Sequence, residues 1–313
     1  MLIDIGISLK ERLENMSRIA VIGSLNIDNV TYTNNLPIPG KTVQGNDFIV
    51  NLGGKGANQA CAIKNLGGDV IFFGAKGKDK NGDLASTILH QFGLKFYLKR
   101  VDAPTGVSNI IINEDNAENM IICVGGANDC INKEDIDFWM PKILECEILI
   151  CQLEIPTDAA LYAIKRAKEA GLTTILNPAP YREFDKKMLC YVDYFIPNEH
   201  ELCDFDNSKQ TLLERCVLAC EMGVKNVIVT LGENGSILYN PIDGSYKVEP
   251  YIVNAVDTTC AGDSYIGSFA YALSIGKDVK EAMKFASYCS ALTVTKKGAI
   301  ISLPHIEDIK YPI

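Results

Sequence analysis

The chain has 313 residues, of which 47% are hydrophobic and 22% are charged, and this is the composition of a globular protein rather than a disordered one. Its formal net charge of -9 argues against a nucleic-acid-binding surface, because such a surface needs clustered lysine and arginine. Apolar runs such as 148–151 and 227–231 are far shorter than the roughly 18 residues that cross a bilayer, so we expect no membrane contact.

The N-terminal segment and the cysteines bear on where the protein resides. Residues 1–17 mix charged and aliphatic side chains and lack the apolar stretch and cleavage site of a secretory signal, so we expect a short extension of unassigned role. The 11 cysteines are spread along the chain without a CxxC pair. This usage favours reduced thiols in a cytoplasmic protein.

From residue 18 onward, short β-branched runs alternate with segments of helical spacing. The runs predict buried strands at 19–23, 70–75, 148–151, 173–177, 194–197 and 227–230. Helices are predicted over 56–66, 82–92, 132–145, 157–170, 208–222, 260–275 and 279–296. This alternation predicts one α/β domain over residues 18–303, in which helices cover both faces of a parallel sheet. Ligands of such sheets bind at the carboxyl ends of the strands.

Two stretches interrupt this rhythm. In residues 29–50 and 105–124, alternation and turn residues replace the helical pattern, which predicts a small β-sheet. Such a sheet can close over a ligand as a lid or pair with a second subunit, and the alternative is an ordinary edge hairpin.

The segment NLGGKGANQA at 51–60 places three glycines around Lys55, just before a predicted helix. Glycine permits positive φ and a close backbone approach, so Gly54, Lys55 and Asn58 can face a polyhydroxylated ligand. The spacing is neither that of a Walker A loop nor that of a dinucleotide-binding GxGxxG motif. The alternative is a glycine-rich turn with a surface lysine.

The segment DTTCAGDSYIG at 257–267 leads from a threonine-rich turn into a predicted helix. A helix start offers free N–H donors to the oxygens of a phosphoryl group. We therefore predict that the amides of Ala261, Gly262 and Asp263 form an anion hole and that Asp263 accepts a proton from an attacking hydroxyl. The alternative is that Asp263 merely caps the helix.

Other polar residues follow the predicted strands. Because carboxyl ends of parallel strands meet at one edge, their joint placement favours a common site, although each alone is compatible with a cap or a turn. They are Asn26, Asp28, Glu154, Asn177, Asn198, Glu201 and residues 230–235.

These motifs occur in an order that resembles the ribokinase family of carbohydrate kinases, over about residues 19–303. The matching segments are GSLNID at 23–28, NLGGKGANQA at 51–60, TGV at 105–107, GGAN at 125–128, QLE at 152–154, NPAP at 177–180, PNE at 197–199, TLGENG at 230–235, DTTCAGD at 257–263 and KKGA at 296–299. The resemblance implies a Rossmann-like parallel-sheet fold with a small β-sheet lid that also forms a homodimer contact.

The resemblance also implies an activity, which is transfer of the γ-phosphoryl group of ATP to the 5-hydroxyl of D-ribose, giving D-ribose 5-phosphate. Asp263 would be the base. Sugar contacts would fall on Asn26, Asp28, Gly54, Lys55, Asn58, Glu154 and Asp263. This full set favours ribose over fructose 6-phosphate or adenosine. Kinases of deoxyribose, fructose, tagatose or a nucleoside remain alternatives, as does a sugar-binding protein without catalysis.

For the cofactors, the resemblance implies ATP, Mg²⁺ and an activating K⁺. The nucleotide contacts would be Asn198, Thr230, Leu231, Gly232, Glu233, Asn234, Gly235, Gly262, Asp263 and Ser287. Glu201 would act on Mg²⁺ through water. The K⁺ site would use Asp257, Thr259, Thr293, Lys296, Gly298 and Ser302, chiefly through backbone carbonyls. One departure from the family signature is Cys260, where alanine, glycine or serine is usual.

Overall fold

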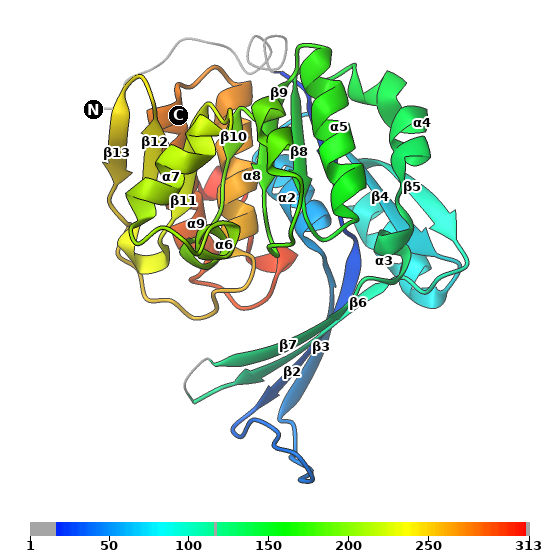
Figure 1. Cartoon of the computed structure of the whole chain (residues 1–313). Helices are drawn as coiled ribbons and strands as arrows, with labels where there is room; N and C mark the ends of the chain where they lie inside the picture. Colours follow the sequence, from blue (N-terminus) through cyan, green and yellow to red (C-terminus); the bar gives the residue numbers. More distant parts are fainter. Residues whose placement is uncertain (1–16, 116–117, 311–313) are drawn as a thin grey trace.

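A large mixed sheet forms the centre of the computed structural model, which describes residues 17–115 and 118–310 (Figure 1). The strand order in the described part is β13-β12-β11-β10-β9-β8-β1-β4-β5. The strands from β11 to β5 are parallel, and β12 and β13 add an antiparallel hairpin at one edge. Their bounds are β1 Ile19–Ile22, β4 Val70–Gly77, β5 Lys95–Val101, β8 Ile148–Gln152, β9 Thr173–Asn177, β10 Tyr194–Phe195, β11 Asn226–Thr230, β12 Ser236–Asn240 and β13 Gly244–Val248.

Helices cover both faces of this sheet, as the alternation predicts (Figure 1). In β1 all four residues are fully buried, Ile19 and Val21 in one core and Ala20 and Ile22 in the other. The first core includes α2 (Lys55–Asn65), α3 (Lys80–Gln91), α8 (Ala261–Ser274) and α9 (Val279–Thr293). The second includes α4 (Lys133–Ile143), α5 (Thr157–Glu169), α6 (Glu199–Phe205) and α7 (Leu212–Glu221). Short 3-10 segments are η1 Gly126–Cys130, η2 Lys186–Tyr191, η3 Gly232–Asn234, η4 Ile300–Ser302 and η5 Ile306–Asp308.

A second sheet projects from the large one, which confirms the predicted small β-sheet (Figure 1). Its order is β3-β2-β6-β7, with bounds β2 Asn26–Thr33, β3 Asp47–Gly53, β6 Gly106–Asn113 and β7 Asn119–Val124. Strands β2 and β6 run parallel and the other two pairs are antiparallel. Because β2 follows β1 after three residues and β3 leads into α2, this sheet begins where the large parallel strands end.

Several elements differ from the prediction. The helix predicted over 208–222 is α7, which starts later, at Leu212, and the two-turn helix α6 before it was missed because seven residues give too short a period to detect. The edge strand β5 was missed because its three basic residues obscure the apolar alternation. The hairpin β12–β13 was also missed, so the sheet is larger than expected and is not parallel throughout.

In the described part of the chain, no helix is long and apolar enough to cross a membrane. All 11 cysteines are free thiols.

Candidate active site

The N-terminus of α2 packs directly against the β1–β2 turn. Gly54 has φ 88°, and a Cβ there would lie 2.9 Å from the backbone of Ser24 and Asn26. A Cβ on Gly56 would lie 2.7 Å from the backbone of Gly23. Since only glycine fits these contacts, they bring the start of α2 to the end of β1, whereas the approach of segment 51–60 to a ligand stays a prediction.

Asp263 lies in the first turn of α8 and does not cap it. The N-cap is Cys260, which has φ 66°, a backbone conformation that is uncommon outside glycine. The Asp263 carboxylate accepts hydrogen bonds from Asn58 Nδ2 at 2.9 Å and from Gln59 Nε2 at 3.0 Å. The alternative role predicted for Asp263, that of a helix cap, is therefore wrong, because its side chain faces α2.

Burial of Asp263, which is 7% exposed, raises the pKa of its carboxyl. The charge of Lys55 and the two amide donors act in the opposite direction. The net effect is upward, so this carboxylate is a stronger base than an ordinary surface aspartate. That property suits a group that must accept a proton.

Two backbone amides at the start of α8 are available to an anion. Among the described residues, nothing accepts a hydrogen bond from the N–H of Gly262 or Asp263. The Ala261 N–H donates instead to the Thr258 carbonyl at 3.3 Å. The anion hole predicted over 261–263 thus has two free donors rather than three. Around Gly262 a Cβ would meet open space, so a ligand can approach this turn.

On the other side of Asp263, acidic side chains surround Lys55. The Glu154 carboxylate accepts hydrogen bonds from Ser24 Oγ at 2.5 Å and from the Lys55 N–H at 3.0 Å. Burial would lower the pKa of the half-buried Lys55, but the charges of Asp263, Glu154 and Glu201 raise it overall. Lys55 is therefore a firmly protonated cation held among acids, not the isolated surface lysine of the alternative interpretation.

Asp28 adds to this cluster a buried carboxylate with one oxygen unpaired in the described part of the chain. It is 5% exposed, and its Oδ1 has no hydrogen-bond partner among the described residues. Burial raises its pKa to about 6; a hydrogen bond from Ser108 lowers it, while the charges of Glu154 and Asp263 add to the increase. The Oδ1 of Asn58 is likewise buried and unpaired in the described structure. These two oxygens can accept hydrogen bonds from a ligand.

Asn26 is held by residues that the sequence interpretation did not assign to the site. Asn128, from η1, donates to Asn26 Oδ1 at 2.8 Å, and Asn26 Nδ2 donates to Ser108 Oγ at 3.3 Å. Asn128 also bonds both the N–H and the carbonyl of Leu25. The matching segment GGAN at 125–128 was the available signal for Asn128, whereas Ser108 has none beyond its place in β6.

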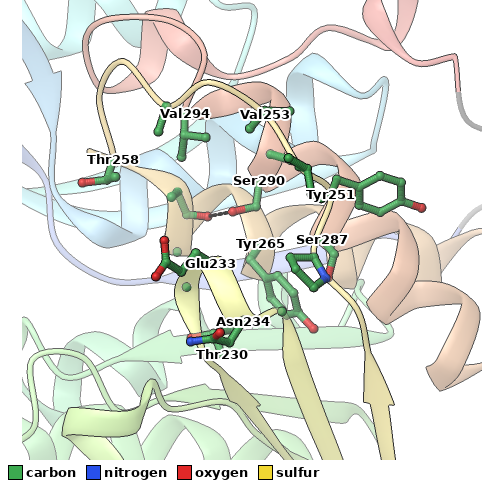
Figure 2. A pocket seen from close by; sticks show the side chains of 18 residues that line it. Thr230, Glu233, Asn234, Tyr251, Val253, Thr258, Tyr265, Ser287, Ser290 and Val294 are labelled. Atoms are coloured by element: carbon green, nitrogen blue, oxygen red, sulfur yellow. Dashed lines mark hydrogen bonds between the residues drawn. The ribbon is translucent and has the colours of Figure 1, made fainter.

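A cavity of about 660 Å³ lies beside the start of α8 and is bounded in part by residues of the 250–255 segment (Figure 2). It brings together these predicted nucleotide residues: Thr230, Gly232, Glu233, Asn234, Gly235, Gly262 and Ser287. Three other predicted ones do not line it. Leu231 packs against the hydrophobic core, Asn198 caps α6, and the Asp263 side chain bonds to Asn58 and Gln59 of α2.

The cavity has an apolar wall that the prediction missed. The wall is formed by Pro250, Tyr251, Ile252, Val253, Ala255, Ala291 and Val294. Ser290 helps shape the floor by donating to the Ala261 carbonyl at 2.9 Å (Figure 2). The apolar run 251–253 was the available signal, but it belongs to no periodic element and so carried no structural prediction.

Glu201 and Asn198 bond each other reciprocally at the start of α6. Glu201 accepts from the Asn198 N–H at 2.9 Å, and the Asn198 side chain accepts from the Glu201 N–H at 2.8 Å. Burial raises the pKa of Glu201. In the residues that the structure describes, no group of three or more His, Cys, Asp and Glu side chains is placed to hold a metal directly. A Mg²⁺ ion that keeps its waters would fit a single carboxylate of this kind.

The six residues predicted to hold a monovalent cation are only partly gathered. Asp257 accepts from the Thr259 N–H at 2.8 Å and from the Gly298 N–H at 2.9 Å, which joins the two loops. The side chains of the other three bond elsewhere: Thr293 to Ser264, Lys296 to Asp308 and Ser302 to Ala299. These three side chains therefore have other partners, and the K⁺ site, which depends chiefly on backbone carbonyls, stays a prediction.

The sequence and the fold of this chain are similar to those of known proteins. The family model described as pfkB family carbohydrate kinase matches residues 16–306. The deoxyribokinase of Salmonella typhi is 38% identical over 297 residues, which cover 93% of this chain and 96% of that protein. The crystal structure of ribokinase from Thermotoga maritima matches with a TM-score of 0.86 and 36% identity, covering 93% of this chain and 97% of that one.

The structure of Arabidopsis thaliana ribokinase complexed with ribose and ATP matches with a TM-score of 0.83 and 30% identity, covering 94% of this chain and 97% of that one. The matched residues extend over nearly the whole chain, including both sheets. The predicted family resemblance is thereby confirmed: the chain belongs to the pfkB family of carbohydrate kinases.

Proposed function

We propose that this kinase transfers the γ-phosphoryl group of ATP to the 5-hydroxyl of D-ribose and releases D-ribose 5-phosphate and ADP. One observation carries the proposal: Asp263 is buried at the start of α8, between the polar cluster around Lys55 and the cavity that Gly262 lines. A hydroxyl bound in the polar cluster and a nucleotide bound in the cavity would meet at this carboxylate.

In the proposed reaction, Asp263 takes the proton as the O–H bond of the sugar breaks. The sugar oxygen bonds to the γ-phosphorus, and the bond between that phosphorus and the β–γ bridging oxygen breaks, so that ADP leaves with its electron pair. The free N–H groups of Gly262 and Asp263 hydrogen-bond the phosphoryl oxygens as their charge grows. Lys55 offsets the negative charge of the surrounding carboxylates.

Two cations belong to the proposal. Glu201 would position Mg²⁺ through water, and the ion would neutralise charge on the phosphates. Carbonyls of the loops joined by Asp257 would hold K⁺ and fix the approach to α8.

The unpaired oxygens of Asp28 and Asn58 support ribose as the sugar. A buried acceptor without a donor costs free energy, and each sugar hydroxyl that supplies a donor removes one such penalty. A site built in this way discriminates strongly against an analogue that lacks the hydroxyl. The second candidate is 2-deoxyribose, which is favoured by the 38% identity to a deoxyribokinase.

The test is ATP-dependent phosphorylation of ribose, deoxyribose, fructose, tagatose and adenosine with Mg²⁺, with and without K⁺. We expect kcat/KM for ribose to exceed that for deoxyribose by about 10²-fold or more. We also expect turnover to rise when K⁺ is added. A preference for deoxyribose would replace ribose as the proposed substrate. Equal rates with and without K⁺ would contradict the proposed activation by K⁺. Failure to phosphorylate any of these compounds would contradict the proposed sugar kinase activity.

We further propose that the small sheet pairs with a second copy of the chain. Its registers place Asp28 and Ser108 on one face. On the opposite face, β3 and β7 expose apolar side chains, namely Phe48, Val50, Met120, Ile122 and Val124, each 42–67% exposed. These side chains lie along the two edge strands, with the Asn29–Asn109 pair of β2 and β6 between them. Exposed apolar side chains gathered on one face in this way are typical of an interaction surface.

Light scattering on the eluting protein is expected to give the mass of a dimer. Ile122→Glu should shift the mass toward the 34.3 kDa monomer, because a charge would be buried at the contact. Ile242→Glu is the matched control, since Ile242 is 93% exposed at the β12–β13 turn, away from this sheet. A wild-type monomer, or equal effects of both changes, would contradict this proposal.

A further inference from the structure

A chain of buried amides runs behind Asp263 and is not explained by contact with a ligand. Gln59 on α2 and Gln152 at the end of β8 are both fully buried, and Asn177 at the end of β9 is 8% exposed. Gln59 Nε2 donates to Asp263 Oδ1 at 3.0 Å and to Asn177 Oδ1 at 3.2 Å. Gln152 Nε2 donates to Gln59 Oε1 at 2.6 Å.

A backbone carbonyl sets which of these side-chain amides donate hydrogen bonds and which accept them. Asn177 Nδ2 donates to the carbonyl of Ile196 at 2.9 Å, and a carbonyl can only accept. Asn177 must therefore turn its oxygen toward Gln59, and Gln59 must donate to it from its NH₂ group. If Gln59 were flipped, its oxygen would face two acceptors, Asn177 Oδ1 and Asp263 Oδ1. The fold thus requires Gln59 to be a donor to Asp263.

The two donors to Asp263 differ in their freedom. Asn58 binds Asp263 Oδ2, but its own oxygen is unpaired in the described structure, so its amide can turn toward a ligand. Gln59 is fixed on both ends of its amide, by Asn177 and by Gln152. When a sugar enters and Asn58 changes partners, Gln59 remains the constant contact of the carboxylate.

We propose that Gln59, oriented by Asn177, is a positioning residue that fixes the rotation of the Asp263 carboxylate and limits its affinity for protons; this rests on the proposed role of Asp263 as the base. Without that donor, the carboxylate would turn and bind a proton too readily. The Asp263 carboxylate would then less often be both deprotonated and correctly oriented toward the sugar hydroxyl.

The test compares Gln59→Met with the wild-type enzyme over a range of pH. Methionine keeps the length and apolar volume of the side chain but has no N–H donor. We expect kcat to fall about 10-fold to 100-fold while KM for the sugar changes little. Removing a hydrogen bond to the charged form raises the pKa of the base, so the acidic limb of the kcat profile should move about one unit to higher pH.

Gln152→Met is the matched control, because Gln152 is equally buried and loses the same group. Asn177 still orients Gln59 in that variant, so we expect a similar loss of thermal stability but an unmoved pH profile. If Gln59→Met does not fold, Gln59→Leu removes the same N–H donor without adding a charge, and the acidic limb should again move to higher pH.

Three outcomes decide the matter. A shifted limb in Gln59→Met or Gln59→Leu with an unshifted one in Gln152→Met supports the inference. Equal profiles in the wild type and in the folded Gln59 variant, or equal shifts in that variant and Gln152→Met, overturn it while leaving the kinase assignment intact. Full turnover in Asp263→Asn removes the base itself and the inference with it.

Discussion

Replacing Asp263 with asparagine is expected to lower kcat for ribose by about 10³-fold, because the variant cannot take the proton of the attacking hydroxyl. The protein should remain folded, since the side chain keeps its shape and its place on α8. Steady-state kinetics give kcat, and calorimetric titration of the sugar in the absence of ATP gives its affinity. We expect the affinity to change far less than kcat.

The hydrogen bonds around Asp263 predict how the variant adjusts. Both Asn58 and Gln59 donate to the carboxylate, but an asparagine at 263 has one oxygen and one NH₂ group. Gln59 is fixed by its other bonds, so Asn58, whose oxygen is unpaired, is the residue that turns. A modest change in sugar affinity is therefore expected through Asn58.

Asp193→Asn is the matched control for the loss of a buried carboxylate. Asp193 is 6% exposed and forms ion pairs with Lys168 and Lys225, neither of which belongs to the candidate active site. We expect that change to lower stability and to leave kcat unaltered. Wild-type turnover in Asp263→Asn, or an equal loss in Asp193→Asn, would be incompatible with Asp263 as the base.

Asp28→Asn should have opposite effects on stability and on function. Burial lifts the pKa of Asp28 from 3.8 to about 6, so the ionised carboxylate at neutral pH destabilises the fold by about 3 kcal/mol. Asparagine removes that charge and is expected to raise the free energy of unfolding at pH 7. Sugar affinity should fall about 10²-fold, because a charged acceptor of hydroxyl hydrogen bonds is lost.

The pH dependence of this difference identifies its cause. The folded wild-type protein gains a proton at Asp28 near pH 6, whereas the unfolded chain gains it only near pH 3.8. Stability contributed by this group therefore rises as the pH falls through 6 and is fully restored below about 4. Denaturant unfolding at several pH values should show the advantage of the variant shrinking over that window. An advantage independent of pH would mean that packing, not ionisation, distinguishes the two side chains.

The sequence predicted those parts of the molecule that depend on local chemistry. Buried strands such as β1 and β8 stand out by their β-branched runs, and Gly54 marks a backbone conformation that other residues rarely adopt. Asp263 is identifiable because a motif surrounds it. The predicted contacts of the ligands remain predictions, although the structure gathers most of them at one edge of the sheet.

What escaped prediction depends on contacts between distant segments. Gln59 and Gln152 are 93 residues apart, and neither residue type signals in sequence that the two amides meet. Asn128 reaches Asn26 across 102 residues in the same way. The apolar wall at 250–255 has no periodicity, because it is a loop shaped by α9 rather than a strand or helix of its own.

Side chains along each strand of the small sheet alternate between its two faces, so an even or odd residue number decides which face a side chain occupies. In β2, Asp28 lies on the face of the polar cluster, whereas its neighbour Asn29 lies on the face where β3 and β7 expose apolar side chains. Inserting or deleting a single residue within β2 or β3 would exchange these faces along the rest of the strand. Lengths of these strands are therefore under strict constraint, while the connection at 34–46 can gain or lose residues at little cost.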